Sequence, residues 1–352
     1  MIARDMCGIR RPWFLLAAVL ACVPMAAGAA DYRKLFAKVD PAVAVIYTVE
    51  RGVAAGGTPG QVSQSGLGSG VLVTTRGYVI TAAHVVQTAD LVEVEFSNGF
   101  RTTAAVTASN PYKDLALLKL DEVPDDITPM RLADSDDVAI GEEVFVIGAP
   151  YGFSHTLSVG HISGRRASEA IDSDGPRAET FQTDAVINQG NSGGPMFNSR
   201  GDVIGIVSYI LSQSGGFEGL GFVITSNEVV ATLFERPMAW SGMSGMLVEG
   251  DLAVLLNVPQ QAGYLVQKVA LNSPAQRAGL RPSLVPATIG GREFLIGGDI
   301  ILSVDGIEVS RSMLEDIRAR WSDETAPGTV ELTLLRGGKV WEISVAVARP
   351  FN

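Results

Sequence analysis

Short apolar and β-branched runs, separated by turn residues, dominate the chain from position 42 to position 225. Typical runs are AVAVIYTVE, LVEVEF, LALLKL and DVIGIVSYI. LVEVEF alternates between apolar and polar positions, and Asn98-Gly99 follows it as a hairpin turn signal. Helical patterning is sparse and is confined to YRKLFAKV near the start and SNEVVATLFE near residue 230. The pattern predicts a closed all-β architecture, either one barrel or a pair of barrels.

The pattern changes after RPMAWSGMSGM, a turn-rich stretch at residues 236–246. GYLVQKV and GGDIILSVDGIEV are predicted strands, and between them Ser273-Pro274 opens a short helix in SPAQRAGL. SRSMLEDIRARW is predicted to form a second helix with Ser310 or Ser312 as its N-cap, and TVELTLLRGGKVWEISVAVA a hairpin. These elements predict a compact α+β unit of about 100 residues.

The beginning of the chain has the layout of a secretory signal. Two arginines precede an apolar stretch that ends in AGA at positions 27–29, an A-x-A type of cleavage site. Two alternatives stay open. The uncharged run 12–30 just reaches membrane-spanning length, which allows an uncleaved anchor, and VLAC loosely resembles a bacterial lipobox with a lipid on Cys22. All three interpretations place the folded part outside the cytoplasm.

Charge and cysteine content narrow the classes of function. The formal net charge is −11 without any basic cluster, which disfavours nucleic acid and anionic lipid as partners. Both cysteines, Cys7 and Cys22, lie in the predicted leader. The mature chain would therefore lack disulfides and thiol nucleophiles, and its stability would depend on a sizeable apolar core.

The stretch QTDAVINQGNSGGPMFN, residues 182–198, crowds three glycines around Ser192. A serine hydroxyl is a weak nucleophile unless a base takes its proton and the developing oxyanion is held. Gly190 can adopt positive φ angles that turn an amide outward, so the amides of Gly190 and Ser192 could converge on one point. The loop therefore suggests an anion-binding pocket beside a nucleophile, with a glycine-rich hairpin as the alternative.

Only three histidines could act as a general base near neutral pH: His84, His155 and His161. His84 ends the apolar strand YVITAAHVV, where two alanines leave room beside the ring. Asp114, just before LALLKL, is a candidate for the carboxylate that orients an imidazole. Each of these residues alone has a simpler structural explanation. Their order, with Ser192 third and each in a distinctive local context, predicts a Ser-His-Asp hydrolase.

TAAHVV, DLALLKL and GNSGGPMF resemble the three catalytic segments of chymotrypsin-fold serine proteases. GSGVLV, IGAPYGF, TDAVINQGNSGGP and GLGFVITSN resemble the HtrA (DegP/DegQ/Deg) branch of that fold. The second unit resembles the C-terminal PDZ domain of this family through SPAQRAGL and GDIILSVDGIEV. The resemblance covers residues 40–349. It implies a mostly β protein, a double β-barrel chymotrypsin-like protease followed by one α+β PDZ domain.

The same resemblance implies a domain organisation. A signal peptide would occupy residues 1–29, the trypsin-like protease domain 31–236, a linker 237–246 and the PDZ domain 247–350. Residues 164–180 fall where the family has a regulatory loop, with an ordinary mobile surface loop as the alternative.

By resemblance His84 is the general base, Asp114 its orienting partner and Ser192 the nucleophile of an acyl-enzyme mechanism. Backbone of Gly190, Asn191 and Ser192 would form the oxyanion hole. The mechanism implied needs neither a metal nor a cofactor.

Ile187, five residues before the nucleophile, would line the primary specificity pocket. Such an aliphatic lining favours small or medium apolar side chains at the cleavage point, and Glu218, in a glycine-rich loop, is predicted to be solvated. PDZ domains capture the C-terminal carboxylate of a peptide with backbone amides, and the peptide adds as a strand. The matching segment is GYLVQ, which makes Tyr264, Leu265 and Val266 the candidates, with an ordinary core strand as the alternative.

The resemblance further implies a periplasmic homotrimer, for which Tyr32 and Phe36 are candidate contacts. Residues 281–297 exceed a minimal PDZ domain and would cover or reshape its peptide groove. The implied function is an ATP-independent serine endopeptidase that degrades misfolded or damaged exported proteins, regulated by peptide C-termini at the PDZ domain. A chaperone with minor proteolysis and a site-specific processing protease are the alternatives.

Overall fold

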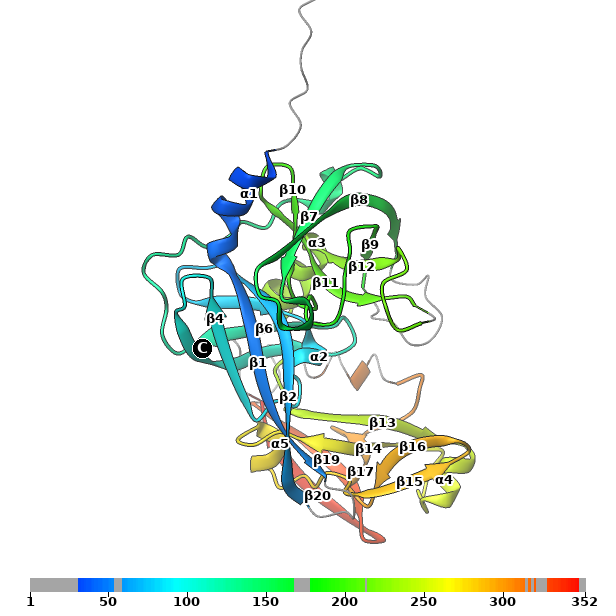
Figure 1. The fold of residues 1–352 in the computed structure, drawn as a ribbon. Helices are drawn as coiled ribbons and strands as arrows, with labels where there is room; N and C mark the ends of the chain where they lie inside the picture. Colours follow the sequence, from blue (N-terminus) through cyan, green and yellow to red (C-terminus); the bar gives the residue numbers. More distant parts are fainter. Residues whose placement is uncertain are drawn as a thin grey trace, which may run out of the picture. The chain divides into compact units, whose positions relative to one another are not determined.

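The computed structural model describes residues 31–53, 59–167, 178–212, 214–313, 316–317, 320 and 328–347. Residues from Tyr32 onward form one unit, which contains two β-barrels and a separate β-sheet (Figure 1). The predicted leader with Cys7 and Cys22 lies outside the described residues. Within the described ranges, no helix is both long and apolar enough to cross a membrane.

The first barrel closes in the strand order β1-β2-β3-β6-β5-β4, with antiparallel neighbours throughout. Its strands are β1 (Val43–Val53), β2 (Pro59–Leu72), β3 (Tyr78–Thr81), β4 (Leu91–Phe96), β5 (Arg101–Asn110) and β6 (Leu115–Leu120). Strand β4 alternates between more and less exposed residues, as its sequence pattern predicts. Buried aliphatic side chains such as Ile46, Ile80 and Leu118 fill the interior.

The second barrel closes in the order β10-β11-β12-β9-β8-β7, so the predicted pair of barrels is confirmed. Its strands are β7 (Glu143–Gly148), β8 (Thr156–Arg166), β9 (Thr180–Thr183), β10 (Pro195–Asn198), β11 (Val203–Ile210) and β12 (Gly221–Thr225). The register between β11 and β12 shifts between Val207 and Tyr209, which leaves Ser208 in a bulge. A bulge of this kind re-aims the side chain and backbone groups of the extra residue.

The third sheet, in the C-terminal part of the chain, has the order β13-β14-β17-β19-β20, with the short strand β18 paired to β17. Its strands are β13 (Met243–Glu249), β14 (Ala262–Val269), β17 (Ile300–Val304), β18 (Ile307–Glu308), β19 (Thr329–Arg336) and β20 (Lys339–Ala346). Strand β13 begins at Met243, inside the stretch 237–246 that was expected to be a linker. The predicted α+β class of this unit is confirmed.

The segment 281–297 folds largely as a hairpin of β15 (Val285–Ile289) and β16 (Arg292–Ile296). It attaches to β14 where the amide side chain of Gln267 exchanges hydrogen bonds of 2.7 and 3.0 Å with the backbone of Leu295. The extra hairpin is therefore fixed to an interior strand of the sheet.

Short helices lie before and between the strands. They are α1 (Tyr32–Val39), α2 (Ala83–Val86), α3 (Ser226–Val230), α4 (Asp251–Leu255) and α5 (Pro274–Arg277). Helix α1 and the start of α5 agree with the sequence pattern, and Ser273 caps α5 by accepting a 3.1 Å hydrogen bond from the amide of Gln276. Helix α3 continues as a π-helical turn to Glu235. The helix predicted in SRSMLEDIRARW lies largely outside the described residues.

Candidate active site

His84 lies in α2, directly after strand β3 of the first barrel. Ala82 and Ala83 beside it are fully buried, so the chain can turn sharply into the helix without displacing core side chains. The ring nitrogen Nδ1 of His84 lies 2.8 and 2.9 Å from the two carboxylate oxygens of Asp114, and its backbone amide donates to Asp114 at 3.0 Å. Asp114 therefore fixes both the backbone and the ring of His84.

Asp114 ends the turn between β5 and β6 in a left-handed conformation, with φ of 53°. The side chain of Asn110 holds this turn, because its Oδ1 accepts from the amides of Tyr112 and Lys113 at 3.1 Å each. The carboxylate of Asp114 is buried and also accepts from the hydroxyl of Ser208. These donors supply the hydrogen bonds that a buried carboxylate needs.

The environment of His84 changes its basicity. Burial alone would lower the pKa of the imidazole, but the hydrogen bond and the negative charge of Asp114 outweigh it and raise the pKa of His84 above its ordinary value. The side chain is nevertheless 52% exposed on the side away from Asp114, which leaves it open to a substrate. The ring is thus a stronger base than a free histidine.

Ser192 lies in the loop between β9 and β10 of the second barrel. Its hydroxyl donates to the backbone carbonyl of Ser208 at 3.3 Å, and among the described residues no hydrogen bond joins it to His84. Ser208 thus touches Asp114 with its hydroxyl and Ser192 with its carbonyl. Ser208, which the sequence did not single out, therefore bonds to two of the three predicted residues, Asp114 and Ser192.

At two glycines next to Ser192, a side chain would clash with neighbouring atoms. Gly190 has φ of 103°, and a Cβ there would lie 2.1 Å from the carbonyl oxygen of Ala149. Gly193 has φ of 83°, and a Cβ there would lie 2.2 Å from the hydroxyl of Thr81. The loop therefore passes close to both barrels, in backbone conformations that other residues rarely adopt.

Two amides of this loop are available to an anion. Among the described residues, no acceptor bonds the amides of Gly190 and Ser192, whereas the amide of Asn191 donates to the carbonyl of Asn188 at 3.0 Å. Of the three residues predicted for an oxyanion hole, Asn191 has its amide bonded within the loop, and the amides of Gly190 and Ser192 have no acceptor among the described residues.

Ser69 in β2 is a second residue whose role the sequence did not predict. Its amide donates to the carbonyl of Ser192 at 2.9 Å, and its hydroxyl donates to the carbonyl of Gly190 at 2.7 Å. The amide of Ala149 in turn donates to the hydroxyl of Ser69 at 3.0 Å. Ser69 belongs to the GSGVLV motif, which resembles the family. The motif alone did not indicate that Ser69 bonds to the loop around Ser192.

The other two histidines have partners elsewhere. Nδ1 of His155 lies 2.7 Å from the carboxylate of Asp40, and Nδ1 of His161 lies 3.8 Å from that of Asp184. Of the three histidines, His84 is the one bonded to Asp114. Within the described residues, no group of three His, Cys, Asp or Glu side chains is placed to hold a metal ion.

Ile187 is buried in the second barrel, and a Cβ at Gly221 would lie 2.6 Å from its Cδ1. Glu218 accepts hydrogen bonds of 3.0 and 2.6 Å from the amide and hydroxyl of Ser214, so its carboxylate bonds within its own loop. The surroundings of Ile187 agree with an aliphatic lining.

Tyr264, Leu265 and Val266 lie in β14, which has neighbours on both sides. Strand β13 pairs with one edge and β17 with the other, and Leu265 and Val266 are almost completely buried. A peptide strand therefore cannot add along these residues, and their prediction as the carboxylate-binding segment is corrected to an interior strand. Within the described residues, the edge of β13 opposite β14 has no strand neighbour.

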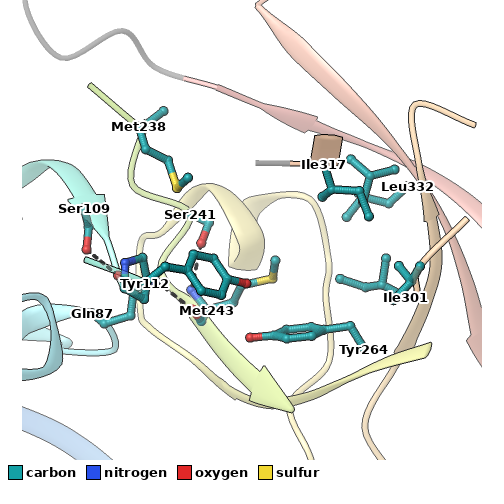
Figure 2. A pocket seen from close by; sticks show the side chains of 14 residues that line it. Gln87, Ser109, Tyr112, Met238, Ser241, Met243, Tyr264, Ile301, Ile317 and Leu332 are labelled. Carbon is teal, nitrogen blue, oxygen red and sulfur yellow. Dashed lines mark hydrogen bonds between the residues drawn. The ribbon is translucent and has the colours of Figure 1, made fainter. Parts of the chain in front are cut away.

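A cavity of about 100 Å³ opens beside the start of β13. Figure 2 shows Ile301, Ile317 and Leu332 on one side of it and Tyr112 and Met243 on the other. The lining is predominantly apolar, and it consists of Gln87, Ser109, Pro111, Tyr112, Met238, Ala239, Ser241, Met243, Tyr264, Ile301, Val304, Val309, Ile317 and Leu332. The side chain of Tyr264 therefore reaches this cavity, although its backbone is in the interior strand.

Comparisons with known proteins define the class to which this fold and site belong. Residues 68–206 match the family model of the trypsin-like peptidase domain, and residues 248–347 match that of the PDZ domain. The chain thus combines a trypsin-like peptidase domain with one PDZ domain.

Individual relatives narrow the class to one family. The chain is 34% identical over 299 residues to a probable periplasmic serine endoprotease, DegP-like, of Marinomonas sp. (strain MWYL1), covering 83% of this chain and 59% of the relative. It is 33% identical over 303 residues to the periplasmic serine endoprotease DegP of Salmonella typhimurium, covering 82% and 58%. The chain therefore spans less than two thirds of the length of these relatives.

Solved structures extend the likeness over whole chains. The HtrA-type protease AlgW with a tripeptide matches with a TM-score of 0.51 at 30% identity, over 90% of this chain and 96% of that chain. AlgW with a decapeptide matches with a TM-score of 0.51 at 29% identity, over 90% and 98%. The chain belongs to the HtrA family of serine proteases.

Proposed function

We propose that this protein is a serine endopeptidase in which Ser192 is the nucleophile, His84 the general base and Asp114 the residue that orients His84. The observation that carries the proposal is the contact series from the His84 ring through the Asp114 carboxylate to Ser208 and on to the Ser192 hydroxyl. In the proposed active arrangement, the Ser192 hydroxyl donates to Nε2 of His84 instead of to the Ser208 carbonyl.

The reaction is acyl transfer. The Ser192 oxygen attacks the scissile carbonyl and transfers its proton to Nε2 of His84, while Asp114 accepts from Nδ1 and stabilises the imidazolium. The amides of Gly190 and Ser192 donate to the carbonyl oxygen as it becomes an oxyanion. The imidazolium then protonates the leaving amine, and a water molecule, activated by the same histidine, hydrolyses the acyl-enzyme.

The direct test is Ser192→Ala with unfolded casein as the substrate. Hydrolysis should be lost while the melting temperature changes little, since the exchange removes one oxygen. A fluorophosphonate probe should label the wild-type protein and not the variant. If Ser192→Ala still hydrolysed casein, Ser192 would not be the nucleophile.

The position of the Ser192 hydroxyl also bears on regulation. Because it donates to Ser208 rather than to His84, the resting protein would react slowly until a ligand or substrate reorients the loop. Fluorophosphonate labelling should therefore accelerate when unfolded protein or a peptide is added. Absence of labelling under both conditions would favour the alternative of a chaperone without proteolysis.

The substrates proposed are misfolded or damaged proteins of the periplasm, cut after small or medium apolar residues. The periplasmic relatives support the location, and the buried, aliphatic surroundings of Ile187 support the preference. Cleavage-site profiling on a denatured proteome should give a broad set of sites after residues such as Val and Ala. A single tight motif would instead favour a site-specific processing protease.

The PDZ domain is proposed to bind peptide C-termini along β13, with the last apolar side chain in the neighbouring cavity. AlgW, the related protease, has been solved with a tripeptide and with a decapeptide, which supports a peptide ligand. Ile317→Asp should weaken binding of an apolar-ended peptide by tenfold or more, measured by fluorescence anisotropy, because a carboxylate would enter the cavity (about 2 kcal/mol). Equal affinity for the same peptide with a C-terminal amide would contradict carboxylate capture.

A homotrimer is proposed from the family, with α1 near the contact. Tyr32 packs edge-to-face against Phe145 at 5.5 Å between ring centroids, and Phe36 packs against the first core. These contacts fix α1 on its own protomer, so any trimer contact would involve the faces that these rings leave exposed. Sedimentation equilibrium of the wild type and of Phe36→Ala should distinguish a trimer from a monomer.

A further inference from the structure

The turn that presents Asp114 has a second attachment to the rest of the protease domain. Lys113, the residue before Asp114, directs its ammonium group to the carboxylate of Glu228, and the two form an ion pair. The side chain of Lys113 is 34% exposed and that of Glu228 only 17%. The pair is therefore better shielded from water than an ordinary surface ion pair, which contributes little.

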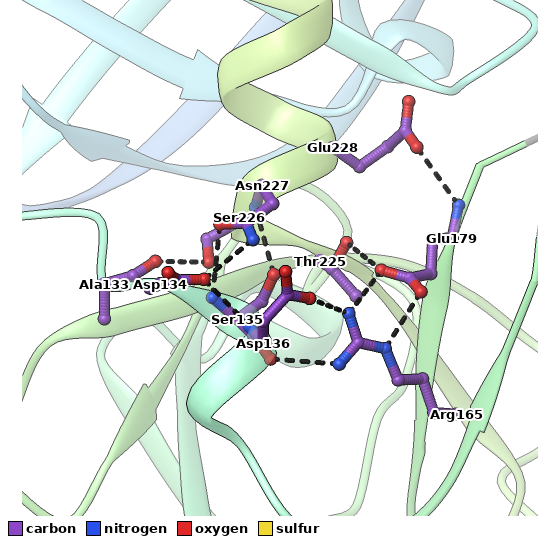
Figure 3. Close-up of polar contacts among 10 residues, drawn as sticks. All are labelled: Ala133, Asp134, Ser135, Asp136, Arg165, Glu179, Thr225, Ser226, Asn227 and Glu228. Carbon is purple, nitrogen blue, oxygen red and sulfur yellow. Dashed lines mark hydrogen bonds and ion pairs between the residues drawn. The ribbon is translucent and has the colours of Figure 1, made fainter.

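Glu228 lies in α3, which directly follows strand β12 of the second barrel and bonds to residues 133–135, in the segment before β7 (Figure 3). Ser226 donates from its hydroxyl to the carbonyl of Ala133 at 2.6 Å. Asn227 donates from its side-chain amide to Asp134 at 2.8 Å, and its backbone amide donates to the hydroxyl of Ser135 at 3.2 Å. Because α3 continues directly from β12, and the amide of Ala133 donates to the carbonyl of Val203 in β11 at 2.8 Å, the position of Glu228 is set by the second barrel.

The acidic residue next to Glu228, Glu179, has its own cationic partner and does not depend on Lys113. Glu179, at the start of the second-barrel strand β9, lies beside Glu228, but Arg165 holds its carboxylate through bonds of 2.9 and 2.8 Å. The amide of Glu179 donates to Glu228 only weakly, at 3.5 Å, and the hydroxyl of Thr232 does so at 3.3 Å. Lys113 is thus the one cation bonded to Glu228 among the described residues.

From this geometry we infer that Lys113 and Glu228 form a positioning pair, which ties the Asp114 turn of the first barrel to the second barrel and so keeps the His84–Asp114 couple in register with Ser192. Asp114 has a left-handed backbone with φ of 53°, a conformation that residues other than glycine keep only where their surroundings hold it. The Ser208 hydroxyl holds the carboxylate, and the ion pair holds the neighbouring backbone.

The inference rests on the proposed triad, and its failure can be told apart from failure of the triad. Ser192→Ala tests the triad by complete loss of hydrolysis. Lys113→Met and Glu228→Gln test the pair by a partial loss, because geometry is loosened while every reacting group remains. Each should lower kcat about tenfold with KM within twofold, since a small misplacement of a catalytic group has effects of this order.

Three further measurements separate positioning from mere stability. The acidic limb of the kcat/KM profile should move to lower pH in both variants, because Asp114 would hold the His84 proton less well. The double variant Lys113→Met/Glu228→Gln should be no slower than either single variant. Lys113→Arg should restore most of kcat, as should the exchanged pair Lys113→Glu/Glu228→Lys, which also serves if a single variant fails to fold.

Arg101→Met is the matched control, because Arg101 forms exposed ion pairs with Glu93 and Glu95 on the same barrel. It should leave kcat and the acidic limb unchanged. The inference is overturned if both single variants keep kcat within twofold of the wild type. It is also overturned if kcat falls additively in the double variant without a shift of the acidic limb, since that result describes a purely structural pair.

Discussion

The two halves of the candidate active site are held in different ways. In the first barrel, His84 and Asp114 bond directly through ring and backbone, and Ser208 and the turn of Asn110 support the carboxylate. In the second barrel, the backbone around Ser192 is held by Ser69 of the first-barrel strand β2, but the Ser192 hydroxyl donates to the backbone carbonyl of Ser208. The proposed base is therefore already bonded to Asp114, whereas the Ser192 hydroxyl is bonded to Ser208.

The largest effect should come from the first half. Asp114→Asn should lower kcat by about 10⁴-fold, because an amide in place of the carboxylate can turn its NH₂ toward Nδ1 of His84 and favour the wrong tautomer. Single-turnover kinetics on a peptide substrate measures it, with Asp126→Asn, which removes an exposed charge on the same barrel, as the control. A loss below tenfold would mean that the directly bonded half is not the catalytic base.

A glycine in the second half should come next. Gly190→Ala should lower kcat by about 10²–10³-fold, because a Cβ would lie 2.1 Å from the Ala149 carbonyl and would displace an amide proposed to stabilise the oxyanion. Gly99→Ala is the matched control, since Gly99 has a similar positive φ of 82° with no atom within 4 Å of the added Cβ. Similar losses in both variants would assign the effect to backbone strain and not to the crowded loop.

Ser208→Ala should have a smaller effect, about tenfold on kcat, because it removes one donor from a carboxylate that keeps its bonds to His84. Ser69→Ala should be similar in size but act on the other half, by releasing the Gly190 carbonyl. Fluorophosphonate labelling rates compare the two variants. If Ser208→Ala cost as much as Asp114→Asn, the carboxylate would depend on Ser208 more than on His84.

The smallest effect is the dependence on pH. Activity requires the neutral imidazole, so the raised pKa of His84 should place the acidic limb of kcat/KM above the ordinary histidine value of about 6.5. The same pairing contributes to stability below that ordinary value, and this contribution is lost as the pH rises through the raised pKa. Thermal melts of the wild type and of His84→Ala across pH 5–9 measure the difference. A limb below 6.5 would contradict a base that Asp114 supports.

The sequence predicted the residues whose signal lies in their own neighbours along the chain. His84 ends an apolar strand, Asp114 precedes one, and Ser192 is surrounded by glycines, so a local pattern marks each of them. The two barrels also follow from many short strands with frequent turns. Helix α1 and the Ser273 cap were predicted because capping and amphipathic spacing are local features.

Residues whose roles depend on strand pairing could not be predicted in this way. Ser208 and Ser69 are ordinary strand serines in the sequence, and their contacts arise only when distant strands meet. Tyr264, Leu265 and Val266 were recognised as a strand, but whether a strand lies at an edge depends on partners far away in the chain. The pattern of β14 indicated its conformation correctly and its exposure wrongly.

The bulge in β11 makes the length of that strand as important as its composition. With one extra residue opposite β12, Ser208 turns its hydroxyl toward Asp114 while its carbonyl remains open to Ser192. Deleting that single residue would restore a regular ladder and leave every predicted catalytic side chain in the chain, yet it would remove a residue that bonds to both Asp114 and Ser192. A relative that keeps all the sequence motifs could therefore lack activity because of a one-residue deletion in β11.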